Sequence, residues 1–573
     1  MNNIRELYDL WVEKTANDAE IHKELEKIRD NEDEILDRFY RNLEFGTAGL
    51  RGVLGAGTNR MNKYTVGQAT QGLANYLNDS YQSSSVAIGY DSRINSDVFA
   101  KLSASILAAN GIKVYLYSRL MPTPMISYAV MRLGCKSGIV ITASHNPSKY
   151  NGYKCYDPAG YQMTEEAAAK TYSFICGTDM FDGVRYADFD GAVASGMIEY
   201  ISDDIIEEYY GLCLKTSINP DVIKKSDVSI IYSPLNGTGN IPVRTVLDRA
   251  GFKDIRVVRE QEQPDGTFPT CPYPNPEIKQ VFECGLEMAK ERPADLLLAT
   301  DPDCDRVGIA VNTKDGYRLL SGNDVGNLLT YYMLSQKKAN GVLPANPIVV
   351  RSFVSTKLVD RICNKYGATL VETLTGFKYI GEKITQLEEE NRKSDFIIGF
   401  EESYGYLVGT HAKDKDAVAA SLLICEMTAY FKEQGKNLAE VLESLYEEYG
   451  YCSSETLSFV FEGADGMTAM ADIMSKTAKN PPEFIGKYKV LRRWDYNTGE
   501  VIDTETGETG KITLPKSNVL AFGLPDGNYA IVRPSGTEPK IKVYLTGTGK
   551  NEAEAAENIK YLGEEMKKLL GIK

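Results

Sequence analysis

Six short apolar runs, rich in β-branched residues, recur along this chain, and each is followed by a polar or glycine-rich loop that leads into a helical pattern. They lie at 86–88, 139–141, 230–232, 296–298, 348–350 and 396–398. Alternation of this kind is typical of parallel α/β architecture. Because the runs come two per block of roughly 110–150 residues, they predict three domains of similar build.

The loops after these runs carry the polar side chains that a binding site needs. Open α/β sheets bind ligands beyond the carboxyl ends of their strands, so each block should turn its loops toward a shared cleft. Ser144 follows the second run and Asp301 follows the fourth. We therefore expect these two residues, far apart in sequence, to lie close together in space.

The two ends of the chain differ from the middle. A chain of 573 residues is too long for one core and implies about three to five domains. The beginning is a charged helical pattern, and the end combines a hairpin-like segment, two strands and a closing helix from Asn551. The predicted fold is α/β, with three similar domains that have mixed, largely parallel sheets and a smaller α+β domain at the C-terminus. The predicted divisions are a helical extension (1–40), domain I (41–213), domain II (214–320), domain III (321–451) and domain IV (452–573).

Charge and cysteine usage exclude several classes of function. The formal net charge of −15 disfavours nucleic acid or an anionic membrane as a partner, so an anionic substrate would need locally concentrated Arg and Lys. The N-terminus has no apolar signal region, and no apolar run approaches the roughly 18 residues of a membrane span. The 10 cysteines form no CxxC pair, which argues against a disulfide scaffold and a zinc site. We expect a cytoplasmic protein.

Three alternating aspartates, Asp301, Asp303 and Asp305, follow the apolar segment ADLLLAT. They would repel one another unless a cation joined them, and hard oxygen ligands suit Mg²⁺. A solvated acidic loop is the simplest alternative. An EF-hand is excluded because its sixth and twelfth positions would hold Arg306 and Asn312. A phosphatase with Asp301 as nucleophile and Asp303 as acid remains an alternative, although it gives Asp305 no role.

The serine segment TASHNP follows another apolar strand, SGIVITA. Pro147 prevents the loop from continuing as a regular helix, so Ser144 should sit on a tight turn. Serines in turns usually bond only locally, and a single histidine is more often structural than catalytic. Next to a candidate nucleophile, however, His145 can orient the hydroxyl or exchange a proton with it.

Four segments, in this order, resemble the signature loops of the α-D-phosphohexomutase family: TASHNP with the following NGYK, DPDCDR, GFEESYG and RPSGTEPK. The resemblance is to the phosphoglucomutase branch, covers about residues 40–550 and begins with FGTAGLRG at Phe45. It implies three similar α/β domains and a smaller C-terminal domain around a central cleft.

The resemblance also implies roles for individual residues. Ser144 matches the family's phosphoserine, whose phosphoryl oxygen joins Asp301, Asp303 and Asp305 at Mg²⁺. Other matched residues lie around the reacting oxygens: Arg51, His145 and Lys154. Either His145 or Lys154 would be the general base.

On the substrate side, the resemblance implies that Glu401 and Ser403 bond sugar hydroxyls and that Thr375 and Gly376 belong to a loop that distinguishes the two ends of the sugar. Arg306 and Lys415 match further substrate contacts. The matched cradle for the phosphate that is not transferred consists of Arg533, Ser535, Gly536 and Thr537.

The reaction implied is interconversion of glucose 1-phosphate and glucose 6-phosphate through glucose 1,6-bisphosphate, which also acts as primer, with Mg²⁺ as cofactor. The open alternatives are phosphopentomutase or phosphomannomutase activity on the same site, or a bisphosphate synthase or phosphohydrolase. A non-catalytic sensor should have lost Ser144 or one of the three aspartates, and none is lost. The expected partners are small sugar phosphates, and the expected assembly is a monomer or small homo-oligomer.

Overall fold

The computed structural model describes residues 2–47, 49–461, 466–534 and 540–572. The chain divides into two compact units, one made of Met1–Gly322 with Phe377–Asn437 and the other of Asn323–Gly376 with Leu438–Lys573. Within the described ranges, none of the helices has the length and apolarity that crossing a bilayer requires.

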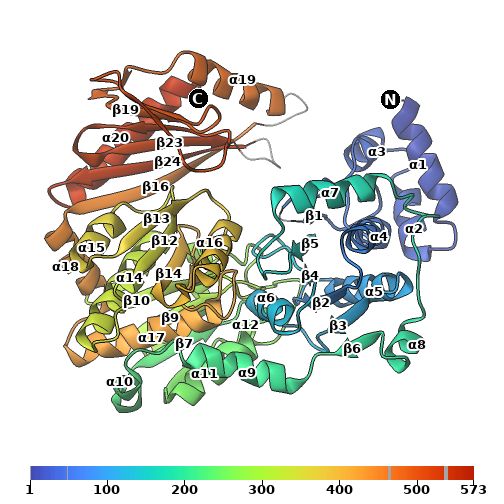
Figure 1. Ribbon diagram of the computed structural model, residues 1–573, viewed down its shortest axis with the longest axis horizontal. Coiled ribbons are helices and arrows are strands. Elements are labelled where there is room, and N and C mark those ends of the chain that lie inside the picture. The colour runs from blue at the N-terminus through green and yellow to red at the C-terminus, as the bar shows by residue number, and fades with distance from the viewer. Residues whose placement is uncertain (1, 48, 462–465, 535–539, 573) are drawn as a thin grey trace. The chain divides into compact units, whose positions relative to one another are not determined.

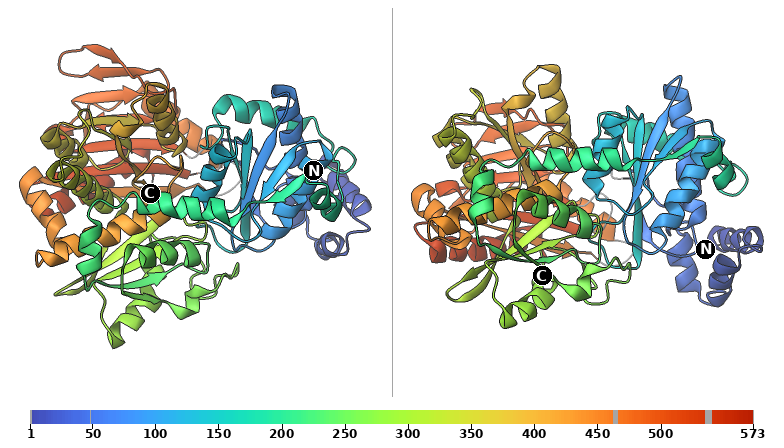
Figure 2. Two further views of the ribbon diagram at one scale, coloured as in Figure 1. Left: turned by 60° about the horizontal axis from the view of Figure 1, so that its bottom comes forward. Right: turned by 90° about the horizontal axis from the view of Figure 1, so that it is seen from below.

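Three helices open the first unit, as the sequence predicts: α1 (Asn2–Lys14), α2 (Ala19–Lys27) and α3 (Glu32–Phe39). Asp18 and Asn31 cap the second and third by accepting backbone N–H groups that have no partner within the helix. The apolar stripes of the helices meet around Trp11 and Phe39, which are fully buried. In Figure 2 these helices form a dark-blue group beside the first sheet.

A six-stranded mixed sheet follows, in the order β1-β5-β4-β2-β3-β6. Strands β2, β3, β4 and β6 are parallel, whereas β5 is antiparallel to β4 and to β1. The strands are β1 (Leu50–Val53), β2 (Ser85–Tyr90), β3 (Lys113–Leu116), β4 (Ser137–Ile141), β5 (Tyr150–Tyr156) and β6 (Ile198–Tyr200). The helices of this region are α4 (Lys63–Ser80), α5 (Ser96–Ala109), α6 (Thr123–Arg132), α7 (Glu165–Cys176), α8 (Phe189–Ala194) and α9 (Asp203–Leu214).

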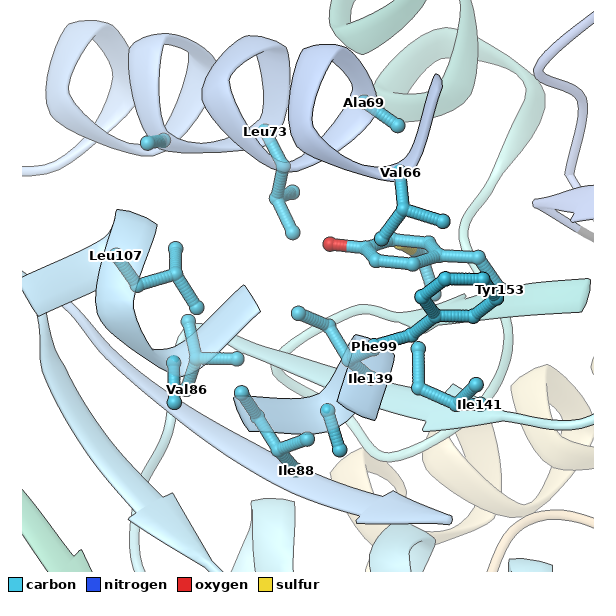
Figure 3. Close-up of a cluster of buried hydrophobic side chains, with 14 of the residues drawn as sticks. Val66, Ala69, Leu73, Val86, Ile88, Phe99, Leu107, Ile139, Ile141 and Tyr153 are labelled. Carbon is cyan, nitrogen blue, oxygen red and sulfur yellow. The ribbon is translucent and has the colours of Figure 1, made fainter. Parts of the chain in front are cut away.

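Alternating residues of these strands face two layers of helices. Val66 and Leu73 of α4 point toward Ile88 and Ile139 of the sheet (Figure 3), and all four are fully buried. On the other face α6 packs so closely that a Cβ at Gly89 would lie 2.5 Å from Ile126. Burying a large aliphatic side chain contributes about 1.5–3 kcal/mol, so these contacts fix the strand ends that carry the loops.

The second sheet has five strands in the order β11-β10-β9-β7-β8. Parallel strands β8, β7 and β9 are extended by the antiparallel hairpin of β10 and β11. The strands are β7 (Ser229–Ser233), β8 (Asp254–Val257), β9 (Leu296–Thr300), β10 (Val307–Thr313) and β11 (Gly316–Leu320). The helices are α10 (Pro220–Lys225), α11 (Asn240–Ala250), α12 (Arg259–Glu262) and α13 (Glu283–Glu291).

The first unit ends with helix α16 (Lys378–Glu389), the antiparallel hairpin of β14 (Phe396–Glu401) and β15 (Gly405–Leu407), and helix α17 (Ala417–Glu433). Almost every side chain of α17 is buried, and the helix packs against α9, α11 and β9. A hydrogen-bonded bridge between Arg306 and Gly405 attaches this hairpin to the loop after β9.

The second unit contains the parallel pair β12 (Ile348–Ser352) and β13 (Thr369–Thr373), with helices α14 (Gly322–Ala339), α15 (Leu358–Tyr366) and α18 (Leu438–Tyr449). It continues into a seven-stranded sheet of order β16-β24-β23-β22-β19-β20-β21, labelled in part in Figure 1. These strands are β16 (Tyr451–Val460), β19 (Arg492–Asp495), β20 (Glu500–Asp503), β21 (Thr509–Lys511), β22 (Leu520–Gly523), β23 (Tyr529–Pro534) and β24 (Lys540–Gly549). Helices α19 (Gly466–Lys479) and α20 (Glu552–Leu570) share one apolar core with it, and β17 (Phe484–Ile485) pairs with β18 (Tyr488–Lys489).

The predicted fold class is therefore confirmed. All six apolar runs lie within strands, namely β2, β4, β7, β9, β12 and β14. The hairpin-like segment near the C-terminus is a three-stranded meander of β19, β20 and β21, and the closing helix is capped by Asn551.

Candidate active site

The three aspartates of the acidic loop lie together between the antiparallel strands β9 and β10. Asp301, Asp303 and Asp305 are at most 1% exposed, and one oxygen from each lies within 4.8 Å of the others. Asp301 shapes the turn, because its Oδ1 accepts the backbone N–H groups of Asp305 at 3.1 Å and Arg306 at 2.9 Å. The sequence pattern thus folds into one buried acidic cluster.

The donor set of this cluster fits a divalent cation. Oδ1 of Asp303 and Oδ1 of Asp305 are buried and accept no hydrogen bond from the described residues. Such oxygens are costly to bury alone, and a cation between them would satisfy both. Burial and the other two carboxylates raise the pKa of Asp301 well above its ordinary value, which is the repulsion that a cation relieves. The three residues could therefore hold a metal ion.

Two lysines partly neutralise the cluster. Lys154, on β5, donates from Nζ to Asp303 Oδ2 at 2.7 Å and to Asp305 Oδ2 at 3.0 Å. Lys415 Nζ lies 3.2 Å from the same Asp305 oxygen. Burial alone would raise the pKa of Asp305, but the two ammonium groups outweigh burial and hold that pKa below its usual range. Asp303 and Asp305 in turn raise the pKa of Lys154 despite its burial, so the lysine is a cation in this arrangement.

Ser144 lies on the predicted tight turn, with a left-handed φ of 52°. Its Oγ donates to Asp301 Oδ2 at 2.9 Å, although the two residues are 157 positions apart in sequence. His145 Nδ1 lies 3.1 Å from Ser144 Oγ. Burial and the positive charges of Arg306 and Arg51 lower the pKa of His145 well below its ordinary value, so its imidazole is neutral near pH 7. The expected meeting of the serine and aspartate loops is confirmed.

Arg93 fixes the backbone of the serine loop, a role that the sequence analysis missed. The side chain follows β2 and is almost completely buried. Its guanidinium donates to four backbone carbonyls of the serine loop, those of Ser144, Asn146, Pro147 and Tyr150. A guanidinium with five donors in a fixed plane suits such a loop. The sequence signal was only the polar DSR segment after the first apolar run.

Further buried bonds fix the position of the serine backbone. Thr142 Oγ1 accepts the N–H of Ser144 at 2.8 Å and donates to Asp91 Oδ2 at 2.6 Å. On the aspartate side, Thr123 Oγ1 donates to Asp303 Oδ2 at 2.8 Å. Both reacting loops are therefore held by neighbouring strand and helix ends, and neither threonine had been singled out from the sequence.

The predicted sugar loop contacts the metal loop directly. Glu401 is the buried last residue of β14, and Ser403 lies in the turn before β15. Within that turn the carbonyl of Tyr404 accepts the N–H of Val307 at 3.1 Å. Gly405 leaves room for the stem of Lys415, because a Cβ there would lie 2.1 Å from Lys415 Cδ.

Two arginines from the predicted set also lie at these loops. Arg51, on β1, donates to Asn146 Oδ1 of the serine loop at 3.2 Å and is exposed. Arg306 donates to Glu277 at 2.6 Å, and its Nε lies 4.0 Å from Asp305 Oδ1. Both can therefore present positive charge to an anionic ligand.

The remaining predicted residues belong to the second unit. Thr375 and Gly376 follow β13. Gly376 has a φ of 120°, a backbone conformation that residues other than glycine rarely adopt. Arg533 lies on β23 opposite Lys542 of β24. Ser535, Gly536 and Thr537 lie outside the described residues.

Comparison with known proteins assigns the chain to a family. It matches all four domains of phosphoglucomutase/phosphomannomutase: alpha/beta/alpha domain I at residues 42–179, domain II at 207–316, domain III at 321–449 and the C-terminal domain at 468–559. The chain belongs to this family. It is 36% identical to a phosphoglucomutase of Staphylococcus saprophyticus over 507 residues, or 88% of this chain and 90% of that protein. It is 35% identical to the phosphoglucomutase of Staphylococcus aureus strain USA300 over 554 residues, or 96% and 97% of the two chains.

Solved structures support the family fold. Parafusin, a phosphoglucomutase from Paramecium in an open form, matches with a TM-score of 0.70 at 17% identity, over 93% of this chain and 96% of that one. A phosphoglucomutase/phosphomannomutase family protein from Burkholderia thailandensis matches with a TM-score of 0.65 at 17% identity, over 92% and 97%.

The family's first three domains all contribute to the acidic cluster. Ser144 and Lys154 come from domain I, the aspartates from domain II and Lys415 from domain III. The phosphohexomutase resemblance seen in the sequence is thereby confirmed, and the chain is an enzyme of the phosphoglucomutase/phosphomannomutase family.

Proposed function

We propose that this chain is a phosphoglucomutase that interconverts glucose 1-phosphate and glucose 6-phosphate, with Ser144 as the phosphoryl carrier. The observation that supports this most strongly is the 2.9 Å bond from Ser144 Oγ to Asp301 Oδ2, which joins two distant loops into one site. Relatives named phosphoglucomutase, which align with most of the chain, support the same reaction.

The proposed reaction has two transfers. In the first, the bond between phosphorus and Oγ of phospho-Ser144 breaks, and the phosphoryl group bonds to the 6-hydroxyl oxygen of glucose 1-phosphate. The 6-hydroxyl loses its proton, and Ser144 Oγ takes up a proton. The resulting glucose 1,6-bisphosphate turns around within the site. In the second, the 1-phosphoryl group bonds to Ser144 Oγ, the serine proton leaves, and the O1 atom of the sugar takes up a proton. Product and substrate differ only in which hydroxyl carries the phosphate.

The proposed cofactor is Mg²⁺, held by Asp301, Asp303, Asp305 and an oxygen on phospho-Ser144. When bound, it supplies positive charge that stabilises the transferring phosphoryl group. Within this chain, Lys154 adds positive charge at Oδ2 of Asp303 and of Asp305, and Lys415 adds it at Oδ2 of Asp305.

We assign the proton transfer at the serine to His145. Its Nδ1 is 3.1 Å from Ser144 Oγ, whereas both hydrogen bonds of Lys154 Nζ go to carboxylates. Lys154 is then an electrostatic group. Arg51, which donates to Asn146 of the serine loop, would add positive charge beside the phosphoryl group.

Substrate binding remains a proposal based on the family resemblance. Glu401 and Ser403 would bond adjacent sugar hydroxyls, with Arg306 and Lys415 beside them, and Thr375 and Gly376 would distinguish the ends of the sugar. The phosphate that is not transferred would bind Arg533, Ser535, Gly536 and Thr537. We keep the four predicted domain ranges as a proposal as well. A cytoplasmic location is proposed because all 10 cysteines are free.

The deciding experiment measures conversion of glucose 1-phosphate to glucose 6-phosphate with Mg²⁺ and a trace of glucose 1,6-bisphosphate. Ribose 1-phosphate and mannose 1-phosphate are assayed in parallel. Fast turnover of glucose 1-phosphate that depends on the bisphosphate primer supports the proposal. Accumulation of inorganic phosphate or of bisphosphate, without isomerisation, would overturn it, and faster turnover of another sugar would replace the substrate.

The serine assignment has its own test. Ser144→Ala should bind sugar phosphate but lose more than about 10³-fold in kcat, because the phosphoryl carrier is absent. Ser92→Ala is the matched control, since the Oγ of Ser92 is buried and bonds to none of the residues that the structure describes. Comparable turnover in the two variants would contradict the phosphoserine role.

A further inference from the structure

A second group of potential metal-binding side chains takes no part in the proposed reaction, although one of them, Asp416, directly follows Lys415, which contacts Asp305. Cys213 is on α9, His411 is in the loop before α17, and Asp416 caps α17. One donor atom from each lies within 4.8 Å of the other two. The cysteine is completely buried, and the side chains of His411 and Asp416 are 5% and 0% exposed. The proposed mutase mechanism uses none of these groups.

Their spacing is close to that of a tetrahedral zinc site. Bond lengths of about 2.3 Å to sulfur and 2.0 Å to nitrogen place the two ligands about 3.5 Å apart. Cys213 Sγ and His411 Nε2 are 3.7 Å apart. His411 Nε2 and Asp416 Oδ2 are 2.7 Å apart, and they would have to separate by about 0.6 Å to reach tetrahedral spacing.

Asp416 is held so that one oxygen remains available. Its Oδ1 accepts three hydrogen bonds, from the Tyr209 hydroxyl at 2.9 Å and from the backbone N–H groups of Val418 and Ala419. Within the described part of the chain, its Oδ2 bonds only to His411, and it lies near the Cys213 thiol. Fixed carboxylates of this kind orient metal ligands.

A cavity borders this group at His411. His411 lines a cavity of about 530 Å³, whose wall includes Leu212 next to Cys213 and Thr410 next to the histidine. The described residues supply three ligands, which leaves the fourth tetrahedral position to water from that cavity.

We propose that Cys213, His411 and Asp416 form a second metal site, which takes one transition-metal ion of the Zn²⁺ class and is separate from the three-aspartate cluster. A sulfur and an imidazole ligand select softer ions than Mg²⁺, whereas the aspartate cluster offers oxygen alone. The ion would also fix the loop that carries Lys415. This site does not depend on the proposed function.

The test uses the full chain, freed of metal with a chelator and then given excess Mg²⁺ to occupy the aspartate cluster. All proteins carry Cys176→Ala, because Cys176 is the exposed thiol. Co²⁺ is titrated, and the thiolate-to-cobalt charge-transfer band is followed in the near ultraviolet. Zn²⁺ retained after desalting is counted by elemental analysis. We expect the band to saturate at about one ion per chain.

Cys213→Ala should lose both the band and the retained zinc, and His411→Gln should do the same. Cys425→Ala removes a different buried thiol, which lies on α17, and should keep both the band and the zinc. Far-ultraviolet circular dichroism checks that each variant is folded. If Cys213→Ala does not fold, His411→Gln alone tests whether the site binds the metal. No band in the parent chain at tenfold excess Co²⁺, or a band that survives both Cys213→Ala and His411→Gln, overturns the proposal.

Discussion

Replacing Arg93 by methionine tests whether one buried guanidinium sets the shape of the serine loop. Nη1 of Arg93 donates to the carbonyls of Pro147 at 3.0 Å and Tyr150 at 3.1 Å, and Nη2 donates to those of Ser144 and Asn146. Methionine fills a similar volume but has no donor, so the four carbonyls lose this partner together.

The magnitude follows from these bonds. Each lost hydrogen bond costs about 1 kcal/mol, which gives about 4 kcal/mol for four. Removing one member of a buried ion pair costs about 3–5 kcal/mol, and Asp91 Oδ2 lies 3.3 Å from Arg93 Nε. The four carbonyls and Asp91 are different partners of one guanidinium, and their contributions are not additive, so we expect the free energy of unfolding to fall by at least about 4 kcal/mol. A displacement of the nucleophile by about 1 Å costs about 10²-fold in rate, so kcat should fall by about that factor.

Turnover of glucose 1-phosphate is measured by a coupled assay, well below the thermal midpoint of every variant, so that unfolded protein does not contribute. Arg256→Met is the matched control. Arg256 lies on β8 and also donates to backbone carbonyls, those of Arg292 and Pro293, but these do not belong to the serine loop. Its kcat should stay within twofold of the parent. If Arg93→Met also stays within threefold, the guanidinium does not position Ser144 and the reasoning fails.

Three further predictions concern the metal, the sugar loop and pH. Mg²⁺ should raise the thermal midpoint of the parent chain but not of Asp303→Asn, because Asp303 Oδ1 is one of the buried oxygens without a partner; an equal rise in both would exclude that ligand. Gly405→Ala should lower kcat about tenfold while the fold is retained, because the new Cβ would lie 2.1 Å from Lys415 Cδ and displace the ammonium from Asp305; unchanged kcat would show that Lys415 is not needed. Burial raises the pKa of Asp157 to about 7, so between about pH 4 and 7 the folded chain keeps a proton that the unfolded chain has lost, and stability falls as pH rises through that window. Asp157→Asn should therefore be more stable than the parent at pH 8, by up to about 4 kcal/mol, and equal to it near pH 4; urea unfolding at both pH values checks this, and an equal gain at both would contradict it.

The sequence predicted those parts of the fold and site whose signal lies in side-chain pattern. Apolar runs located the strands, and the rule that loops meet at strand ends placed Ser144 beside Asp301. It could not predict Arg93, because the partners of that side chain are backbone carbonyls, which every residue carries.

The two potential metal-binding groups also differ in how far the sequence reveals them. The three aspartates alternate within five positions, so their spacing is visible in the sequence. Cys213 and His411 are 198 positions apart and meet only because α9 packs against α17, so a search for CxxC spacing does not find them. Thr375, Gly376 and Arg533 belong to the second unit, and their roles stay predictions.

An acidic chain that handles sugar phosphates must overcome its own charge. The formal net charge is −15, so an approaching phosphate meets a repulsive average field. At the site, the charges of Asp301, Asp303 and Asp305 are offset by three cations, those of Lys154, Lys415 and Arg306. Asp414 and Glu277 also lie beside Lys415 and Arg306, so a divalent cation among the aspartates would bring the local charge closer to neutral. A local balance of this kind, invisible in the composition, allows an anionic substrate to bind an acidic protein.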